Sequence, residues 1–473
     1  MKQFLRKGID YHKLLEEADQ LKNNDTIWAS GKYFGFVYTP PKEIKNTVDK
    51  ISIKFSQGNT INPILFGSLS RMEKEIILKV GELLHAPKNF AGHLTSGGTE
   101  SIFLAVKAAQ TRFENLFGNE RVMEAIIGDT AHPAFIKACS YLKVNPIIVP
   151  HDTNYRIDTK KITEAITENT GLIVGSSPNY PYGIIDDIKS IGEIGQSHNI
   201  PVHVDACIGG LFLPFIESAK SKFDFQVKGV TSISVDLHKY GYCPKGNSII
   251  LYRDSSMRMN QYFVSSLWNA GFFGSVRLLG TTGGGPVAGA WATLKLLGKD
   301  GYKAITNTVQ NSAKYLKEKI NQIPGLYTVA NPIGPVFTFS SISINSYELG
   351  DLLEEKGWYL ERFSNPECLG IILTIENISK VDEFLIDLIL CVEELRKKNS
   401  NYKNHQKWAS IMYHTLPEKV TDKLLSLMVK KDSISRNRSI YKRFLYGLNN
   451  EKENTKKLNH TILELLDKIH QIN

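Results

Sequence analysis

The sequence predicts an α/β fold in which a large, mostly parallel sheet is covered by helices and is followed by a smaller α+β domain. Between about residue 70 and residue 297, short apolar runs of strand length alternate with amphipathic segments of helix length. This rhythm is typical of parallel sheets, whose crossover helices cover both faces. After residue 300 the alternation gives way to a mixed pattern. A chain of 473 residues is too long for one compact core, so two or more domains are expected.

The first 65 residues are expected to form an N-terminal arm, with a helix near Tyr11–Lys22 followed by irregular polar sequence. The large domain is expected over residues 66–300, with helices predicted from apolar residues three and four positions apart and strands from short apolar runs. The predicted helices are 71–84, 101–117, 132–142, 162–167 and 188–198, and the predicted strands are 124–127, 146–149, 172–175, 201–205, 230–235 and 248–252.

The smaller α+β domain is expected over residues 301–398, and a helical C-terminal segment over residues 399–473. The predicted helices are 302–320, 347–356 and 381–397, and the predicted strands are 325–329, 336–341 and 371–375. The last helix of the C-terminal segment carries Ile462, Leu465, Leu466 and Ile469 at helical spacing, which favours packing over a cofactor contact.

Composition and charge are those of an ordinary soluble globular protein, with 42% hydrophobic residues, 22% charged residues and a net charge of +9. The five cysteines form no Cys-x-x-Cys pair, which disfavours a metal site or a disulfide framework. No segment suits a signal peptide or a membrane span, so a cytoplasmic protein is expected. The basic C-terminal stretch favours a solvated helical face over peripheral contact with an anionic membrane, and no nucleic-acid-binding motif accompanies it.

A lysine follows the predicted strand 230–235, in the stretch Ser-Val-Asp-Leu-His-Lys-Tyr-Gly-Tyr that ends at Tyr242. Active sites of parallel α/β folds lie at the carboxyl ends of the strands. An amine held there, partly desolvated and next to another potential cation, can form a Schiff base with a carbonyl. Lys239 is such an amine, although most lysines near strand ends are solvated surface groups.

Three further segments carry chemistry. Residues 94–101, Leu-Thr-Ser-Gly-Gly-Thr-Glu-Ser, run into a helix whose N-terminus suits a phosphate, although a capped, Gly-rich helix start has the same pattern. Asp205 ends a strand, where a buried carboxylate either pairs with a protonated ring nitrogen or caps the next helix. His132 can stack on a planar ring or serve as an acid or base, although a lone histidine is more often structural.

Together these groups match the parts of pyridoxal phosphate. The loop at 94–101 fits the phosphate, His132 the ring face, Asp205 the pyridine nitrogen and Lys239 the aldehyde. A carboxylate that keeps the pyridine nitrogen protonated makes the ring an electron sink. The order of the groups along the chain is that of the aspartate-aminotransferase-like, fold-type I enzymes.

The chain resembles the group II pyridoxal-phosphate-dependent decarboxylase superfamily and, within it, the sphingosine-1-phosphate lyases. The resemblance spans residues 25–415 and rests on long motifs at 95–101, 178–183, 203–210 and 228–246, with a weaker match at Trp408–Tyr413. It implies that Lys239 forms the Schiff base, that Asp205 pairs with the pyridine nitrogen and that His132 stacks on the ring. The implied ligands of the cofactor phosphate are Gly98, Thr99 and His238.

The resemblance also implies features beyond the cofactor. Lys245, in a Pro-Lys-Gly segment, would contact a phosphate of the substrate, and Tyr180 would supply an active-site aromatic ring. The family forms obligate homodimers with sites at the interface, so the loop around Gly280 and Thr281 would reach the partner's cofactor.

Two departures from the lyase pattern concern the substrate. The lyases carry a His-Pro-Asp insert after Asn-Pro-Leu, whereas here Asn62-Pro63-Ile64-Leu65 continues directly into Phe66-Gly67-Ser68. They also have Ser-Arg-Pro-Gly where this chain has Thr281-Thr282-Gly283-Gly284, so an arginine is lost. Both changes remove polar groups suited to substrate binding and leave the cofactor set intact.

A small-molecule amine is the expected substrate, and three functions are considered. The resemblance favours an aldehyde-lyase that converts a phosphorylated long-chain base to a fatty aldehyde and phosphoethanolamine. The lost histidine and arginine motivate the alternative, an amino-acid decarboxylase on the same cofactor. A non-catalytic binding relative is disfavoured by the intact Lys239, Asp205 and His132.

Overall fold

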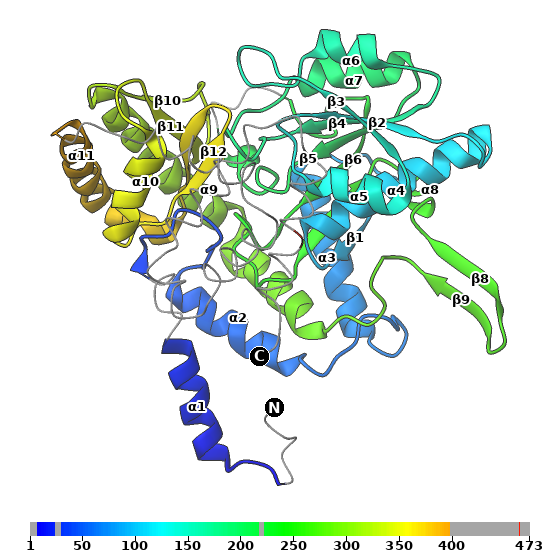
Figure 1. Cartoon of the computed structure of the whole chain (residues 1–473). Helices are drawn as coiled ribbons and strands as arrows, with labels where there is room; N and C mark the ends of the chain where they lie inside the picture. The colour runs from blue at the N-terminus through cyan, green and yellow to red at the C-terminus, as the bar shows by residue number, and fades with distance from the viewer. Residues whose placement is uncertain (1–6, 24–29, 217–221, 398–462, 464–473) are drawn as a thin grey trace, which may run out of the picture.

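The computed structural model describes residues 7–23, 30–216, 222–397 and 463. A large α/β unit and a smaller unit lie side by side (Figure 1). The predicted C-terminal helical segment lies outside the described residues, apart from Leu463. Within the described ranges, no helix is long and apolar enough to cross a bilayer.

The large unit is built on a seven-stranded sheet with the order β1-β7-β6-β5-β4-β2-β3. β7 runs antiparallel to both of its neighbours, and the other six strands share one direction. The predicted, mostly parallel sheet is therefore confirmed, while β1 was not predicted. The strands are β1 (Ala91–Thr95), β2 (Glu124–Gly128), β3 (Asn145–Val149), β4 (Thr170–Ser176), β5 (Val202–Asp205), β6 (Val230–Val235) and β7 (Ser248–Tyr252).

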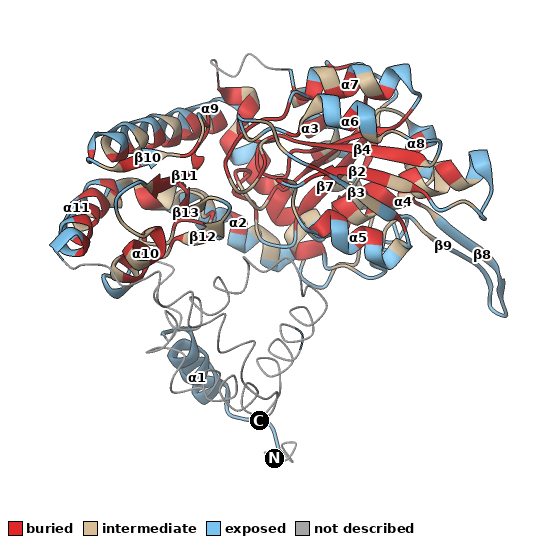
Figure 2. Ribbon diagram, turned by 45° about the horizontal axis from the view of Figure 1, so that its top comes forward, coloured by how far each residue is buried: buried red, intermediate tan, exposed pale blue. Residues whose placement is uncertain are grey.

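Both faces of this sheet are buried, as continuous apolar strands require. On β4, Leu172 and Val174 pack into the cluster formed by two helices on one face, whereas Ile173 packs with Ile188 and Ile191 on the other. Figure 2 shows the resulting core as a buried layer between exposed helix faces. The helices of this unit are α3 (Gly67–Leu83), α4 (Gly98–Phe117), α5 (Ala134–Leu142), α6 (Thr159–Ala165), α7 (Ile188–Ser197) and α8 (Ser255–Met259), with the 3₁₀ turn η2 (Leu213–Phe215).

The smaller unit contains an antiparallel sheet with the order β10-β11-β13-β12 and a core of its own. Helix α9 (Gly284–Gln322) kinks at Gly298, where φ is 57°, beside the predicted domain boundary at residue 300. The predicted strand 371–375 lies too late, because β13 ends at Ile372 and the 3₁₀ turn η3 follows. The elements are β10 (Leu326–Thr328), β11 (Val336–Ser341), α10 (Ser346–Glu355), β12 (Glu361–Ser364), β13 (Glu367–Ile372), η3 (Ile375–Lys380) and α11 (Val381–Lys397).

The prediction of irregular polar sequence after the first helix is wrong. Helix α1 (Tyr11–Asn23) buries no residue, but a second helix, α2 (Lys42–Lys54), packs against α9. Between them, Phe34 is fully buried in the core of the smaller unit, 5.6 Å from the ring of Trp358 and 4.8 Å from that of Phe384. Sequence periodicity cannot reveal this contact, because the partners of Phe34 lie more than 300 residues away along the chain.

A hairpin that was not predicted projects from the large unit (Figure 1). Its strands are β8 (Phe263–Trp268) and β9 (Gly271–Ser275). Leu267 is 92% exposed and Phe272 is 85% exposed, so the hairpin presents apolar side chains to solvent.

Candidate active site

A cavity of about 370 Å³ lies where the carboxyl ends of β4, β5 and β6 meet the start of α4. Ser176 pairs with Asp205 and Asp205 with Ser234 in the sheet register, so the strand ends align at one edge. This is the edge at which α/β folds place their ligands. The cavity brings together seven of the predicted site residues: Gly98, Thr99, His132, Tyr180, Asp205, His238 and Lys239.

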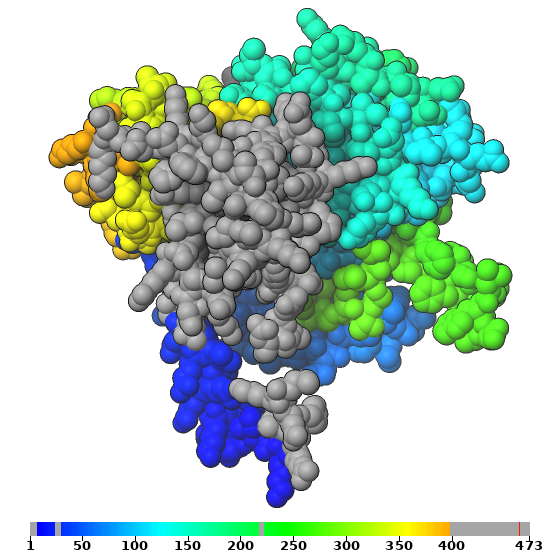
Figure 3. Space-filling model, in the orientation of Figure 1, coloured from blue at the N-terminus to red at the C-terminus, as the bar shows by residue number. Residues whose placement is uncertain are grey.

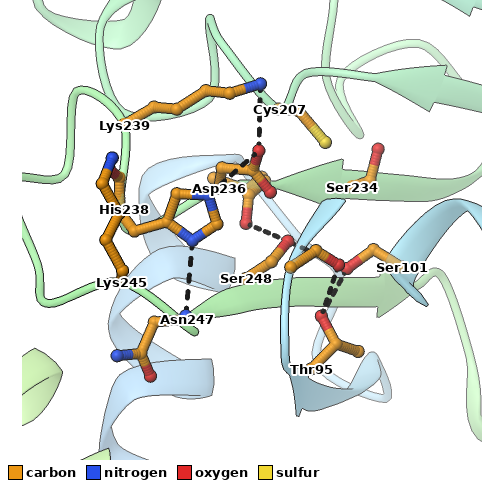
Figure 4. Close-up of polar contacts among 12 residues, drawn as sticks. Thr95, Ser101, Cys207, Ser234, Asp236, His238, Lys239, Lys245, Asn247 and Ser248 are labelled. Carbon is orange, nitrogen blue, oxygen red and sulfur yellow. Dashed lines mark hydrogen bonds and ion pairs between the residues drawn. The ribbon is translucent and has the colours of Figure 1, made fainter. Parts of the chain in front are cut away.

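Lys239 forms an ion pair with Asp236, with 3.0 Å between the lysine Nζ and the carboxylate Oδ2 (Figure 4). Burial is the largest influence on the pKa of Lys239 and lowers it, but the charge of Asp236, together with those of Cys207, Tyr38 and Asp205, raises this pKa above its ordinary value. Burial in turn opposes ionisation of Asp236, while Lys239 and His238 hold the pKa of Asp236 below its usual range. Asp236 was not predicted as a site residue, and its one signal was its position three residues before Lys239.

The N-terminus of α4 forms one end of the cavity. Gly98 and Thr99 line the cavity, and because the first N–H groups of a helix have no intrahelical partner, they are suited to bind an anion there. Gly98 is required, because a Cβ atom there would lie 2.9 Å from both Asp236 oxygens and from the Cys207 sulfur.

His238 completes this end of the cavity. Its Nδ1 accepts the backbone N–H of Asn247 at 3.3 Å, and burial lowers its pKa. The ring is therefore neutral, with its proton on Nε2, and it can donate a hydrogen bond to an anion.

Asp205 and His132 also line the cavity. Asp205 Oδ1 accepts the Cys207 backbone N–H at 3.0 Å and the Ser234 hydroxyl at 3.2 Å, while no described residue donates to Oδ2. His132 Nδ1 accepts the backbone N–H of Ala134 at 3.1 Å, and burial lowers the pKa of His132. A neutral imidazole and a carboxylate with one open oxygen thus face the same space.

Tyr180 lines the cavity as well. Its ring lies edge-on to that of His132, with 6.4 Å between the two centroids.

Lys245 lies beside the cavity rather than in its lining. Its Nζ donates to the carbonyl oxygens of Phe36, at 2.9 Å, and His238, at 3.2 Å, and lies 5.1 Å from the centroid of the Tyr38 ring. Burial, and then the charge of Lys239, lower the pKa of Lys245. Sequence reasoning missed Tyr38, whose pKa burial raises to about 12. The contact of Lys245 with a substrate phosphate stays a prediction.

Gly280 and Thr281 are exposed and do not line the cavity of their own chain. The neighbouring Thr282 is held by hydrogen bonds to Thr60. The predicted reach of this loop to a partner's cofactor therefore also stays a prediction.

The donor set fits pyridoxal phosphate. The α4 N-terminus and the N–H of His238 suit its phosphate, the open oxygen of Asp205 suits a protonated ring nitrogen, and the Lys239 amine belongs to the same lining. In the described residues, no cluster of three or more His, Cys, Asp or Glu side chains is arranged to hold a metal ion. Fold and cavity together define a fold-type I, pyridoxal-phosphate-dependent enzyme.

Comparison with known proteins gives the family. Residues 59–341 match the pyridoxal-dependent decarboxylase conserved domain. The sphingosine-1-phosphate lyase of Saccharomyces cerevisiae is 38% identical over 417 residues, which cover 86% of this chain and 70% of that protein. The chain belongs to the pyridoxal-dependent decarboxylase family.

A solved structure of the Burkholderia pseudomallei sphingosine-1-phosphate lyase Bpss2021 superposes with a TM-score of 0.81 at 32% identity, covering 88% of this chain and 98% of that one. A probable L-tyrosine/L-aspartate decarboxylase of Methanosphaera stadtmanae is 31% identical over 395 residues, 82% of this chain and 99% of that protein. Within the family, the protein is a sphingosine-1-phosphate-lyase-like enzyme, and the decarboxylases are its more distant relatives.

Proposed function

We propose that the protein cleaves a phosphorylated long-chain amino alcohol between C2 and C3 and releases a fatty aldehyde and phosphoethanolamine. The observation that carries the proposal is the position of Lys245, a second cation held on the carbonyl of His238 immediately beside the cofactor cavity. If the amine of the substrate reaches Lys239, a phosphate on the same substrate needs a second cation to bind it. The similarity to the yeast and Burkholderia lyases supports the same substrate class.

Four residues of the cavity have a task in this reaction. The bound cofactor supplies an electron sink for the bond that breaks. Asp205 keeps the positive charge on the ring nitrogen, and His132 covers the ring face. Lys239, once displaced by the substrate amine, is an amine that can hold or return a proton, with Asp236 as its counter-ion.

Turnover of defined substrates tests the proposal. Purified protein is incubated with sphingosine-1-phosphate, with sphingosine and with a panel of amino acids, and aldehyde and carbon dioxide are both measured. Aldehyde from the phosphorylated base alone is expected. Carbon dioxide from an amino acid, without aldehyde, would establish the decarboxylase alternative, which the missing lyase histidine and arginine favour.

Two lysine variants refine the test. Lys245→Ala is expected to lose turnover of the phosphorylated base while it keeps its cofactor. The control is Lys295→Ala, because Lys295 pairs with Glu75 on the surface, away from the cavity. If both variants turn over the phosphorylated base at the same rate, Lys245 does not bind the substrate phosphate.

We also propose that the active form is a homodimer. The β8–β9 hairpin protrudes from the surface (Figure 3), and its exposed apolar side chains need a protein partner. A second copy of the chain would supply such a partner. Leu267→Asp is therefore expected to yield monomer in sedimentation, whereas Ile342→Asp, at a position 84% exposed on the smaller unit, is not. An unchanged dimer in Leu267→Asp would remove the hairpin from the interface.

A further inference from the structure

A chain of buried hydrogen bonds leads across two strands to Asp205. His203, on β5, is fully buried, with its Nδ1 2.9 Å from the Ser232 Oγ and its Nε2 3.2 Å from the Ser234 Oγ. The Ser234 Oγ in turn lies 3.2 Å from Asp205 Oδ1. The sheet register pairs His203 with Ser232 and Asp205 with Ser234, so backbone pairing holds all four side chains in place.

The negative charge of Asp205 fixes the direction of every bond in this chain. A carboxylate can only accept, so the Ser234 hydroxyl donates to Asp205. Because a hydroxyl has one hydrogen, Ser234 must accept from an N–H at His203 Nε2. Burial lowers the pKa of His203 to about 4, so at neutral pH its ring carries a single proton and Nδ1 accepts from Ser232. All donors therefore point toward the carboxylate.

We infer that His203 and Ser234 are positioning residues that orient the Asp205 carboxylate and leave its Oδ2 open to the cavity, and that they thereby set the affinity for the protonated ring nitrogen of pyridoxal phosphate. Oδ1 is occupied by Ser234 and by the Cys207 backbone N–H, so Oδ2 is the oxygen that remains. Hydrogen bonds to an ionised acceptor are stronger than neutral ones, and polarised chains reinforce one another in a buried site.

Dependence on the ring nitrogen distinguishes this role from simple packing. Cofactor is removed from the full-length protein, and dissociation constants are measured for pyridoxal phosphate and for its analogue with C–H in place of the ring nitrogen. In Ser234→Ala, affinity for pyridoxal phosphate is expected to fall about tenfold, because a hydrogen bond to a charged group is lost, while affinity for the analogue stays within about twofold. The control, Ser340→Ala, removes another buried sheet serine and should change neither constant.

Two substitutions at His203 test the direction of the chain. His203→Gln keeps an N–H that can replace Nε2, whereas His203→Leu has none. The glutamine variant is expected to keep most of the affinity, and the leucine variant to lose as much as Ser234→Ala. Should His203→Leu fail to fold, as judged by its melting temperature, Ser234→Ala decides alone. Equal losses for both cofactors, or no loss for either, would overturn the inference.

Discussion

Asp236 controls the reactivity of the Schiff-base lysine, and Asp236→Asn tests this control. Two unit charges separated by the 3.0 Å between Lys239 Nζ and Asp236 Oδ2 attract by about 5.5 kcal/mol at an effective dielectric constant of about 20. This attraction favours the charged amine and so holds the pKa of Lys239 above its ordinary value. Because the lysine side chain is 24% exposed, solvent screens part of this attraction, and the pKa of Lys239 is expected to fall in the variant, where burial is no longer opposed by the Asp236 carboxylate.

The measurement is the rate at which cofactor-free protein captures pyridoxal phosphate, followed by absorbance over a range of pH. Capture requires a neutral amine, so the rate at neutral pH reports the fraction of Lys239 that is uncharged. In Asp236→Asn the rate should begin to rise at lower pH, and capture at neutral pH should become faster. Asp49→Asn, which breaks an exposed pair with Lys45, is the control and should leave the profile unchanged. If Asp236→Asn captures the cofactor no faster than the wild type at neutral pH, Asp236 does not hold the proton on Lys239.

Three further predictions concern the cofactor loop, the N-terminal segment and the buried histidine. Gly98→Ala places a Cβ atom 2.9 Å from the Asp236 oxygens and should weaken cofactor binding about tenfold in an absorbance titration, whereas Gly274→Ala, with open space around it, should not. Phe34→Ala should lower the free energy of unfolding by about 3 to 5 kcal/mol in urea, and Phe36→Ala, at a position 59% exposed, by much less; equal losses would contradict the packing described for residue 34. The pKa of His203 is 6.5 in the unfolded chain, and burial lowers it to about 4 in the folded protein. The contribution of a neutral His203 to the free energy of unfolding is therefore fully present above pH 6.5, and the free energy of unfolding should fall by about 3 kcal/mol as the pH drops to about 4. His203→Gln should show a shallower acid slope in urea unfolding, and identical slopes would refute the assignment.

The sequence alone determined the type of fold and the identity of the cofactor. Strand–helix alternation is a local property of the chain, so it predicted the parallel strands of the large sheet. The cofactor groups lie in local motifs at Gly98, His132, Asp205 and Lys239, each beside a strand end or a helix start, and the parallel topology then required them to meet. Strand β12 and the β8–β9 hairpin were not predicted, because their short segments lack a clear apolar period.

Only the tertiary structure decided how these groups act on one another. The pairing of Lys239 with Asp236, and the path from His203 through Ser234 to Asp205, depend on which side chains the strand register and the following turn place within 3.2 Å. Likewise, Phe34 packs against Trp358 in the smaller unit, and the ring of Tyr38 lies beside Lys245. Each pair is separated by more than 200 residues of sequence. Local propensity carries no information about such distant contacts, since they are set by packing of whole elements. The sequence thus identifies the cofactor, and the fold sets the charge and orientation of the side chains that bind it.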